Sequence, residues 1–209
     1  MIKCNVTACG CIISSAEEKT NKDGNKFMSF ALSVPLQGRD QSVKEVRINV
    51  SAPWDAGQTA NYTTGRRATI TGILYIRKYE GNTYFNLRTD QGIELNESTV
   101  PDRLEGTMEF TGKIGKKGIE DHKSKKGKDI QTFSAFSSDK DGDKREFTWV
   151  NFLNLSPIHA DYLAAEKYVH VCGELKLDVY KSSLQLECLV KSVSAWGLNN
   201  TSSDSAAQD

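Results

Sequence analysis

Two tyrosines and an arginine recur at every second position of one segment, as Tyr75, Arg77 and Tyr79. In an extended strand, alternate side chains share a face, so the two rings would lie about 7 Å from the guanidinium on either side. A ring stacks on an unpaired base, and an arginine contacts a phosphate or stacks as a planar cation. Strand propensity or a dimer contact explains a single exposed tyrosine equally well. The cluster, however, predicts a sequence-tolerant contact with single-stranded nucleic acid.

The segments that position this cluster have a period of two. Residues 68–79 alternate between an apolar face and the face that carries the tyrosines, which predicts a strand with one buried side. A turn and a second strand, in which Phe85 and Leu87 point inward, complete a hairpin. The outward face continues over this hairpin and an earlier strand through Arg47, Asn49, Tyr84, Asn86 and Arg88. Further strands are expected at residues 2–13, 27–34 and 43–51, with a short helix within 53–62.

The chain repeats itself after about a hundred residues, with offsets of 101 to 104 between matching positions. This repeat predicts a first domain at 1–95, a linker at 96–106, a second domain at 107–198 and a disordered tail at 199–209. The matched residues are Gly10 and Gly112, Gly24 and Gly127, Phe30 and Phe133, Asn49 and Asn151, Pro53 and Pro157, Gly72 and Gly173, and Tyr79 and Tyr180.

Each copy is predicted to contain five strands, with a short helix between strands 3 and 4. In the second copy, Ser156 as N-cap and Pro157 at the first helical position favour that helix. This order predicts an all-β protein of two tandem OB-fold five-stranded Greek-key barrels. Gly72 and Gly173 fall on the inward faces of their long strands, where glycine lets a barrel strand bend; a weak point in an open sheet is the alternative.

The second copy presents a different outward face. Phe147 and Trp149 alternate with core-type residues, which predicts two exposed rings. Its long strand carries Lys176, Asp178 and Tyr180 at the positions of the first cluster. Because the acid replaces an arginine and repels phosphate, we expect the two barrels to bind unequally, with the first binding more tightly.

Composition excludes several classes of protein. The 209 residues hold 27 basic and 27 acidic side chains, which excludes a histone-like polycation, and 38% hydrophobic residues exclude disorder of the whole chain. No run approaches the roughly 18 apolar residues that span a bilayer, and the first residues lack a long apolar stretch, so we expect a cytoplasmic protein with no membrane partner. Seven lysines lie between 113 and 128, where a solvated loop is the simpler interpretation and a basic patch the alternative.

Residues for catalysis or metal binding are not evident. The five cysteines form no CxxC and no zinc-ligand spacing, so reduced strand residues are expected, with a metal or redox role as the alternative. Asp139, Asp141 and Asp143 are close enough to hold a nuclease metal, but turn formation explains them more simply. An EF-hand would need a glutamate where Thr148 stands. We therefore expect a protein that is not an enzyme and needs no cofactor or metal.

A series of short motifs runs through the first copy: Gly10-Cys11-Ile12, Glu17-Glu18-Lys19-Thr20, Asp23-Gly24, Phe30-Ala31-Leu32, Tyr62-x-x-Gly65, the strand from Thr69 to Leu74, and Arg77-Lys78-Tyr79. Through these motifs the first copy resembles bacterial single-stranded DNA-binding protein over about ninety residues. The second copy matches that family chiefly through Gly173-Glu174-Leu175 and Tyr180. The resemblance implies that a base stacks on Tyr79 and that Lys78 belongs to the binding segment.

The chain also departs from that family. Ala16 stands where the family usually has proline, and the third strand near Val46 lacks the family's usual tryptophan. Trp149 can take the place of that tryptophan in the second copy, and Trp54 is expected to reach the first groove. The chain lacks the family's glycine-rich tail with its acidic and aromatic end. We therefore do not expect it to recruit replication or recombination proteins through such a tail. The difference favours a phage, plasmid or mobile-element protein.

The resemblance implies a protein that coats and protects single-stranded DNA during replication, recombination or repair. Since the family usually presents four barrels, it also implies a homodimer of two-barrel chains. The alternative is an OB-fold accessory module that binds protein partners in a replication or transfer complex.

Overall fold

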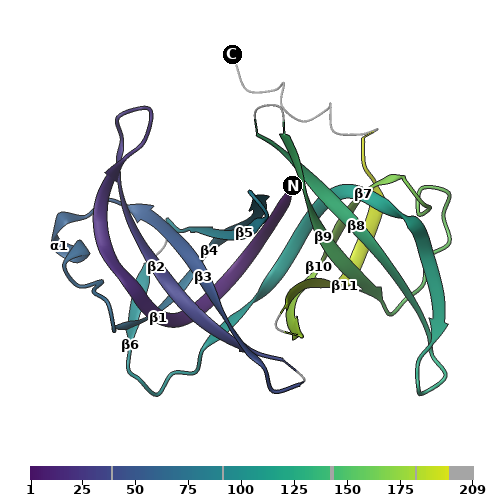
Figure 1. The fold of residues 1–209 in the computed structure, drawn as a ribbon, viewed down its shortest axis with the longest axis horizontal. Helices are drawn as coiled ribbons and strands as arrows, with labels where there is room; N and C mark the ends of the chain where they lie inside the picture. Colours follow the sequence, from purple (N-terminus) through teal and green to yellow (C-terminus); the bar gives the residue numbers. More distant parts are fainter. Residues whose placement is uncertain (39, 91, 142–143, 182, 198–209) are drawn as a thin grey trace, which may run out of the picture.

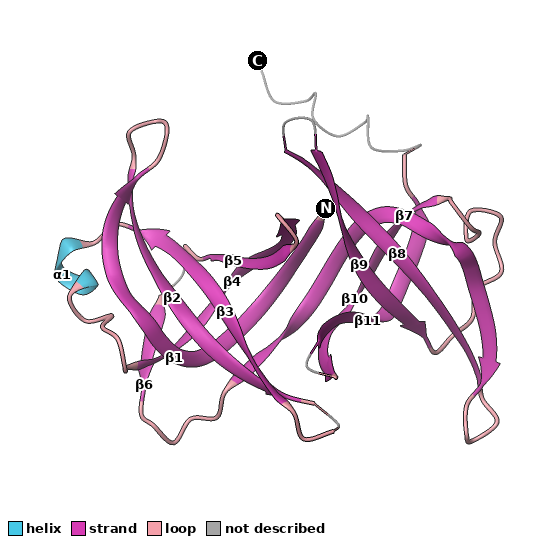
Figure 2. Cartoon of the chain, in the orientation of Figure 1, coloured by secondary structure: helices cyan, strands magenta, loops and turns pink. Residues whose placement is uncertain are grey.

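The computed structural model describes the chain except residues 39, 91, 142–143, 182 and 198–209, so the predicted tail at 199–209 lies outside the described residues. The described part is almost entirely β-structure (Figures 1 and 2). Its elements are β1 (Ile2–Thr20), β2 (Lys26–Gln37), β3 (Val43–Pro53), α1 (Ala56–Thr59), β4 (Arg67–Tyr79), β5 (Asn82–Arg88), β6 (Ile93–Asn96), β7 (Arg103–Lys123), β8 (Asp129–Asp141), β9 (Lys144–Asn154), β10 (Tyr168–Tyr180) and β11 (Ser183–Ala195).

The strands close into two barrels of the same topology. In the first barrel, β1 pairs with β2, β2 with β3, β3 with β5 in parallel, β5 with β4, and β4 again with β1. The strands β7, β8, β9, β11 and β10 repeat this order in the second barrel. The predicted fold class, an all-β chain with two five-stranded OB-type barrels, is confirmed.

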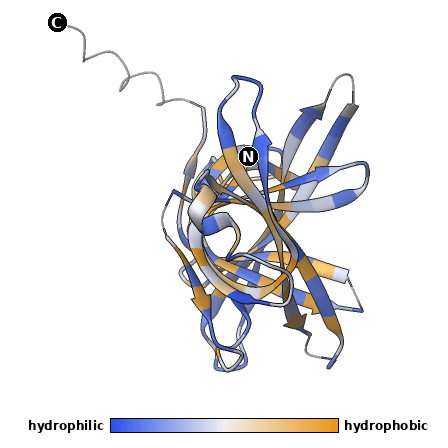
Figure 3. Ribbon diagram, turned by 90° about the vertical axis from the view of Figure 1, so that its left-hand side faces the viewer, coloured by the Kyte–Doolittle hydropathy of each residue, from blue (hydrophilic) through white to orange (hydrophobic). Residues whose placement is uncertain are grey.

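Alternation of apolar and polar residues along the strands builds the interior (Figure 3). On β4 the predicted inward residues Ala68, Ile70, Leu74 and Ile76 are all buried. One apolar cluster continues through both barrels, and in the second it includes the stacked rings of Phe133 and Phe152, whose centroids lie 4.8 Å apart. The same cluster holds the thiols of Cys4 and Cys188, whose pKa values burial raises to about 12. These thiols therefore stay neutral at physiological pH.

The first strands of the two copies join the barrels. β1 pairs with β7 in antiparallel register from Ile2 opposite Phe110 to Cys9 opposite Arg103 (Figure 1). Asn5 lies opposite Thr107 at the middle of this ladder, and the two residues are equivalent under the repeat. The pairing is therefore approximately two-fold symmetric, as in an isologous dimer, but it forms within one chain and gives one continuous eleven-stranded sheet.

The connection between the barrels falls within the predicted linker at 96–106. β6 ends at Asn96 and β7 begins at Arg103, so only residues 97–102 lie outside the strands. The side chain of Arg67 on β4 holds this connection in place, because its Nη2 donates to the Val100 carbonyl at 2.7 Å and to the Asp102 carboxylate at 2.6 Å.

A short helix follows β3 in the first barrel, and none follows β9 among the described residues of the second. The Asp55 side chain accepts hydrogen bonds from the Gly57 and Gln58 N–H groups and so caps α1. Its four residues make it far too short to cross a membrane, and the described part of the chain contains no longer helix.

The helix predicted from Ser156 and Pro157 is absent, and residues 155–167 form turns and irregular structure instead. The Asn154 side chain accepts the Ser156 N–H at 3.0 Å. The buried Gln131 side chain binds the backbone of Ile158 at both its carbonyl (3.2 Å) and its N–H (3.4 Å). In a helix that begins at Pro157, the Ile158 carbonyl would pair within the helix, whereas here it accepts from the Gln131 side chain. The prediction of a second helix was therefore wrong.

The long-strand glycines have a physical reason common to both copies. A Cβ at Gly72 would lie 2.2 Å from the carbonyl oxygen of Arg88, and one at Gly173 would lie 2.3 Å from that of Leu189. Arg88 and Leu189 are themselves equivalent residues of β5 and β11. A close backbone approach therefore requires glycine at these positions, and a weak point in an open sheet does not explain them.

Candidate nucleic-acid interface

The predicted cluster lies on the outward side of the β4–β5 hairpin. Tyr79 and Tyr84 are 40% and 38% exposed, with ring centroids 6.3 Å apart in an edge-on arrangement. Arg77 lies directly opposite Tyr84 in the strand register and is exposed. Tyr75 is half-buried, and the guanidinium of Arg88 lies 5.7 Å from the centre of its ring. The hairpin thus presents three rings interleaved with two guanidinium groups.

This face lines a cleft of about 770 Å³. The hairpin forms one side, and Phe27, Ser29, Asn49 and Ser51 of β2 and β3 form another. Within the described residues, five basic side chains and one carboxylate line the cleft: Lys19, Arg77, Lys78, Arg88 and Lys140, with Asp139. An excess of positive charge beside exposed rings suits a polyanion whose bases are unpaired.

Most of the predicted residues of the first copy meet in this one cleft. Asn49, Tyr75, Arg77, Lys78, Tyr79, Tyr84, Asn86 and Arg88 all line it. Asn49 and Asn86 are joined by a hydrogen bond of 3.3 Å across β3 and β5. Arg47 is exposed on β3 and its Nε lies 3.4 Å from the Asn49 side-chain oxygen, but it does not line the cleft. Trp54 is also outside the cleft lining, because it packs against the hydrophobic core.

Sequence reasoning missed several residues of the cleft. Lys19 belongs to the motif Glu17-Glu18-Lys19-Thr20, which indicates the family resemblance but does not by itself predict a binding residue. Phe27 and Ser29 line the cleft because β2 pairs with β3, which in turn pairs with β5 of the hairpin. Lys140 belongs to β8 of the other barrel, so only the arrangement of the two barrels could have identified it.

The second barrel carries its exposed rings on a different strand pair. Phe147 and Trp149 of β9 are 44% and 51% exposed, as the alternation predicts. Phe136 of β8 lies between them, with ring centroids 5.2 Å from Phe147 and 4.9 Å from Trp149. Phe136 was missed, although it alternates with the buried Phe133 and Ala135 and so points outward. We call these three side chains the β8–β9 ring cluster.

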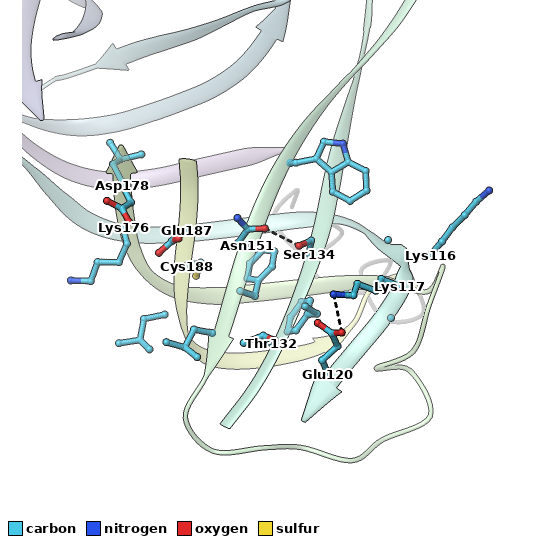
Figure 4. Close-up of a pocket in the computed structure, with 18 residues that line it drawn as sticks. Lys116, Lys117, Glu120, Thr132, Ser134, Asn151, Lys176, Asp178, Glu187 and Cys188 are labelled. Atoms are coloured by element: carbon cyan, nitrogen blue, oxygen red, sulfur yellow. Dashed lines mark hydrogen bonds and ion pairs between the residues drawn. The ribbon is translucent and has the colours of Figure 1, made fainter. Parts of the chain in front are cut away.

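The second barrel also has a cleft at the position of the first, with a volume of about 760 Å³ (Figure 4). Its described lining holds as many carboxylates as ammonium groups: Lys116, Lys117 and Lys176 against Glu120, Asp178 and Glu187. Two of the lysines are engaged locally, since Lys117 pairs with Glu120 at 2.9 Å and Lys176 with Glu174 at 2.5 Å. The hydrogen bond from Lys176 lowers the pKa of the Glu174 carboxyl. This cleft therefore lacks the positive excess of the first.

Tyr180, the counterpart of Tyr79, lies apart from that lining. It is 60% exposed, and the ammonium group of Lys181 lies 5.3 Å from its ring centre. A hollow beside it is lined by three carboxylates, those of Asp40, Asp178 and Glu187. Hydrogen bonds from Ser42 hold the pKa of Asp40 below its usual range, so that carboxylate is charged at neutral pH.

A metal site does not form in the described part of the chain, where no three His, Cys, Asp or Glu side chains gather as ligands. Of the acidic residues considered from the sequence, Asp139 lines the first cleft, whereas Asp143 and the side chain of Asp141 lie outside the described residues.

No protein-family model matches the sequence, and no curated protein matches it. Among solved structures, the chain is similar to wild-type single-stranded DNA-binding protein from Thermus aquaticus, with 12% identity, coverage of 98% of this chain and 97% of that one, and a TM-score of 0.46. The Plasmodium falciparum SSB in complex with ssDNA has 19% identity over 44% of this chain and 95% of that one, with a TM-score of 0.36.

The dimeric N-terminal domain of PriB from Thermoanaerobacter tencongensis has 22% identity over 45% of this chain and 98% of that one, with a TM-score of 0.31. All three scores lie below 0.5, so the function of this chain has to be argued from its own residues.

Proposed function

We propose that the protein binds single-stranded DNA with little dependence on sequence, and that it coats and protects unpaired strands during replication, recombination or repair. One observation carries the proposal: three tyrosines and two arginines of a single hairpin converge on one open, positively charged cleft. Tyr79 and Tyr84 are substantially exposed on this hairpin, and Tyr75 is half-buried. The proposal includes no reaction, cofactor or metal.

Each part of the cleft matches a part of an unpaired strand. The exposed faces of Tyr79 and Tyr84 can stack on bases, which gives affinity for every base because each has a π-face. Arg77 and Lys78 flank these rings and can contact the phosphates between stacked bases. In a duplex the base faces are already stacked on one another, so the same rings have nothing to bind. The cleft should therefore discriminate against double-stranded DNA.

We further propose that the chain comprises domains at 1–95 and 107–198 and acts as a homodimer. The β1–β7 ladder already uses the equivalent first strands within one chain, so a second copy must associate through another surface. Two chains would then supply four barrels to one strand. Light scattering should report about twice the chain mass of 23.2 kDa, and a monomer at working concentration would contradict this part of the proposal.

The function is tested by titrating the full chain with labelled oligo-dT of about 30 nucleotides and with a duplex of equal length, at two salt concentrations. We expect the open strand to bind at least about a hundredfold more tightly at the higher salt, because duplex contacts are limited to phosphates. We also expect affinity for dT to fall as salt rises. Equal affinity for strand and duplex, or no binding of dT, would contradict the proposal.

A further inference from the structure

We infer that a strand leaving the first cleft continues onto the outer face of β8 and β9, across the β8–β9 ring cluster, and not onto the β10–β11 hairpin that is equivalent to the first binding hairpin. The inference rests on the proposed function. It means that the two barrels, although built alike, hold the strand with different surfaces.

The first cleft is continuous with the β8–β9 hairpin. Asp139 and Lys140, near the end of β8, line the cleft together with residues of the first barrel. The N–H of Gly81, at the tip of the β4–β5 hairpin, donates to the Glu146 carboxylate on β9 at 3.2 Å. The tip of the β4–β5 hairpin therefore contacts β9 directly, and this contact leads a strand that follows Tyr79 and Tyr84 onto β8 and β9.

The ring cluster begins one residue beyond that contact, at Phe147. The strand registers make Phe136, Phe147 and Trp149 equivalent to Ser33, Glu45 and Arg47 of the first barrel, which are polar. The barrel interior therefore does not require aromatic residues at these positions. Phe147 and Trp149 are exposed and Phe136 is half-buried between them, so the sheet surface offers consecutive bases a stacking platform.

Charged groups of both signs lie at the start of this route, namely the carboxylates of Asp139 and Glu146 and the ammonium group of Lys140. Glu146 accepts the Gly81 N–H. Asp139 lies near the Met1 ammonium, whose pKa burial lowers and Asp139 raises in part. The ammonium group of Lys140 lies where the first cleft meets β8.

At the far end, Trp149 packs over Gly115, where an added Cβ would lie 3.0 Å from the indole Cζ3. Lys116 and Lys117 follow Gly115 and line the cleft beside Trp149, with Lys117 also paired to Glu120 (Figure 4). Basic side chains thus stand at both ends of the ring cluster, where the phosphates of a strand entering and leaving it would lie.

The alternative route along the β10–β11 hairpin is electrostatically unfavourable. Asp178 replaces Arg77, and Glu187 replaces Asn86. Asp40, from the loop after β2, adds a third carboxylate beside Tyr180. These three charges would repel the phosphates that a base stacked on Tyr180 brings with it.

The first test follows the fluorescence of Trp149 in a chain whose other two tryptophans are replaced, Trp54→Phe and Trp196→Phe. Protein in excess is titrated with oligo-dT of about 8 nucleotides, which suits a single barrel, and of about 30 nucleotides, which can reach both. We expect the long strand to quench Trp149 and the short strand to leave its emission unchanged. Binding of the long strand without quenching would overturn the inference.

The second test measures the affinity of two double variants for both lengths. Phe147→Ala with Trp149→Ala should weaken binding of the long strand about tenfold or more and leave the short strand unaffected. Lys176→Ala with Tyr180→Ala is the matched control and should change neither. The reverse pattern would overturn the inference while leaving the proposed function intact, whereas loss of all dT binding by the unmodified chain would reject the proposed function itself.

Discussion

Replacing Tyr79 and Tyr84 together by alanine should weaken binding of oligo-dT by at least about thirtyfold. Each ring that stacks on a base contributes about 1–3 kcal/mol, so two rings account for about 2 kcal/mol or more. Both side chains are substantially exposed, and each contributes to the wall of the same cleft. Their removal therefore costs little core packing, and thermal unfolding should stay close to that of the unmodified chain. Fluorescence titration with oligo-dT measures the affinity.

The second barrel supplies the matched control. Tyr180 occupies the position equivalent to Tyr79, is 60% exposed, and lies among carboxylates. Tyr180→Ala should change the affinity by less than about threefold, because repulsion already keeps phosphates from that hairpin. Equal losses from Tyr79→Ala and Tyr180→Ala would show that the two barrels bind alike, contrary to the charges described above.

Neutralising the two arginines of the cleft should lower both the affinity and its dependence on salt. Each phosphate neutralised on a single strand contributes about 0.7 to the slope of log affinity against log salt. Arg77→Gln with Arg88→Gln should thus reduce the slope by about 1.4 if both guanidinium groups contact phosphate. The affinity loss should be largest at low salt, where the arginines of the unmodified cleft attract the strand most strongly.

Arg66→Gln is the control for this experiment. Arg66 is exposed and donates to the Asn61 carbonyl at 2.9 Å, away from the cleft. Its replacement should leave the salt slope unchanged. If the double variant loses affinity at an unchanged slope, the arginines act by stacking or by supporting Tyr75, and their assignment to phosphate contacts is wrong.

The fold and most of the first cleft could be predicted because they depend on local alternation. Along β4, residues of one parity are apolar and fill the barrel, so Tyr75, Arg77 and Tyr79 have to point outward. The repeat then transfers the same pattern to the second half. Gly72 and Gly173 were also informative, because each lies where the backbone of the next strand approaches too closely for a side chain, and both copies share this approach.

Features that depend on distant residues could not be predicted in this way. The helix expected after Pro157 fails because the amide of Gln131, more than twenty residues earlier in the sequence, binds the Ile158 backbone. Lys140 joins the first cleft only because the β1–β7 ladder places β8 beside the first barrel. Trp54 was expected to reach the first groove, but its position after β3 lets it pack against the core.

The two clefts differ in charge although the barrels that form them share one strand order. Strand order is the same in both barrels, and Gly72 and Gly173 occupy equivalent positions. The charge of the clefts differs through outward side chains, such as Asp178 in place of Arg77 and Glu187 in place of Asn86. Since outward residues contribute little to the core, such exchanges can alter binding without altering the fold.

The most direct measurement is photochemical cross-linking of the protein to oligo-dT that carries 5-iododeoxyuridine, followed by peptide mapping. This chemistry reports aromatic side chains that stack on a base. We predict cross-links to Tyr79 and Tyr84, with Tyr75 as a weaker site because it is half-buried. Cross-links confined to other exposed rings, such as the adjacent Tyr168 and Trp196, would show that the strand lies elsewhere and would contradict the assignment of the β4–β5 hairpin as the binding surface.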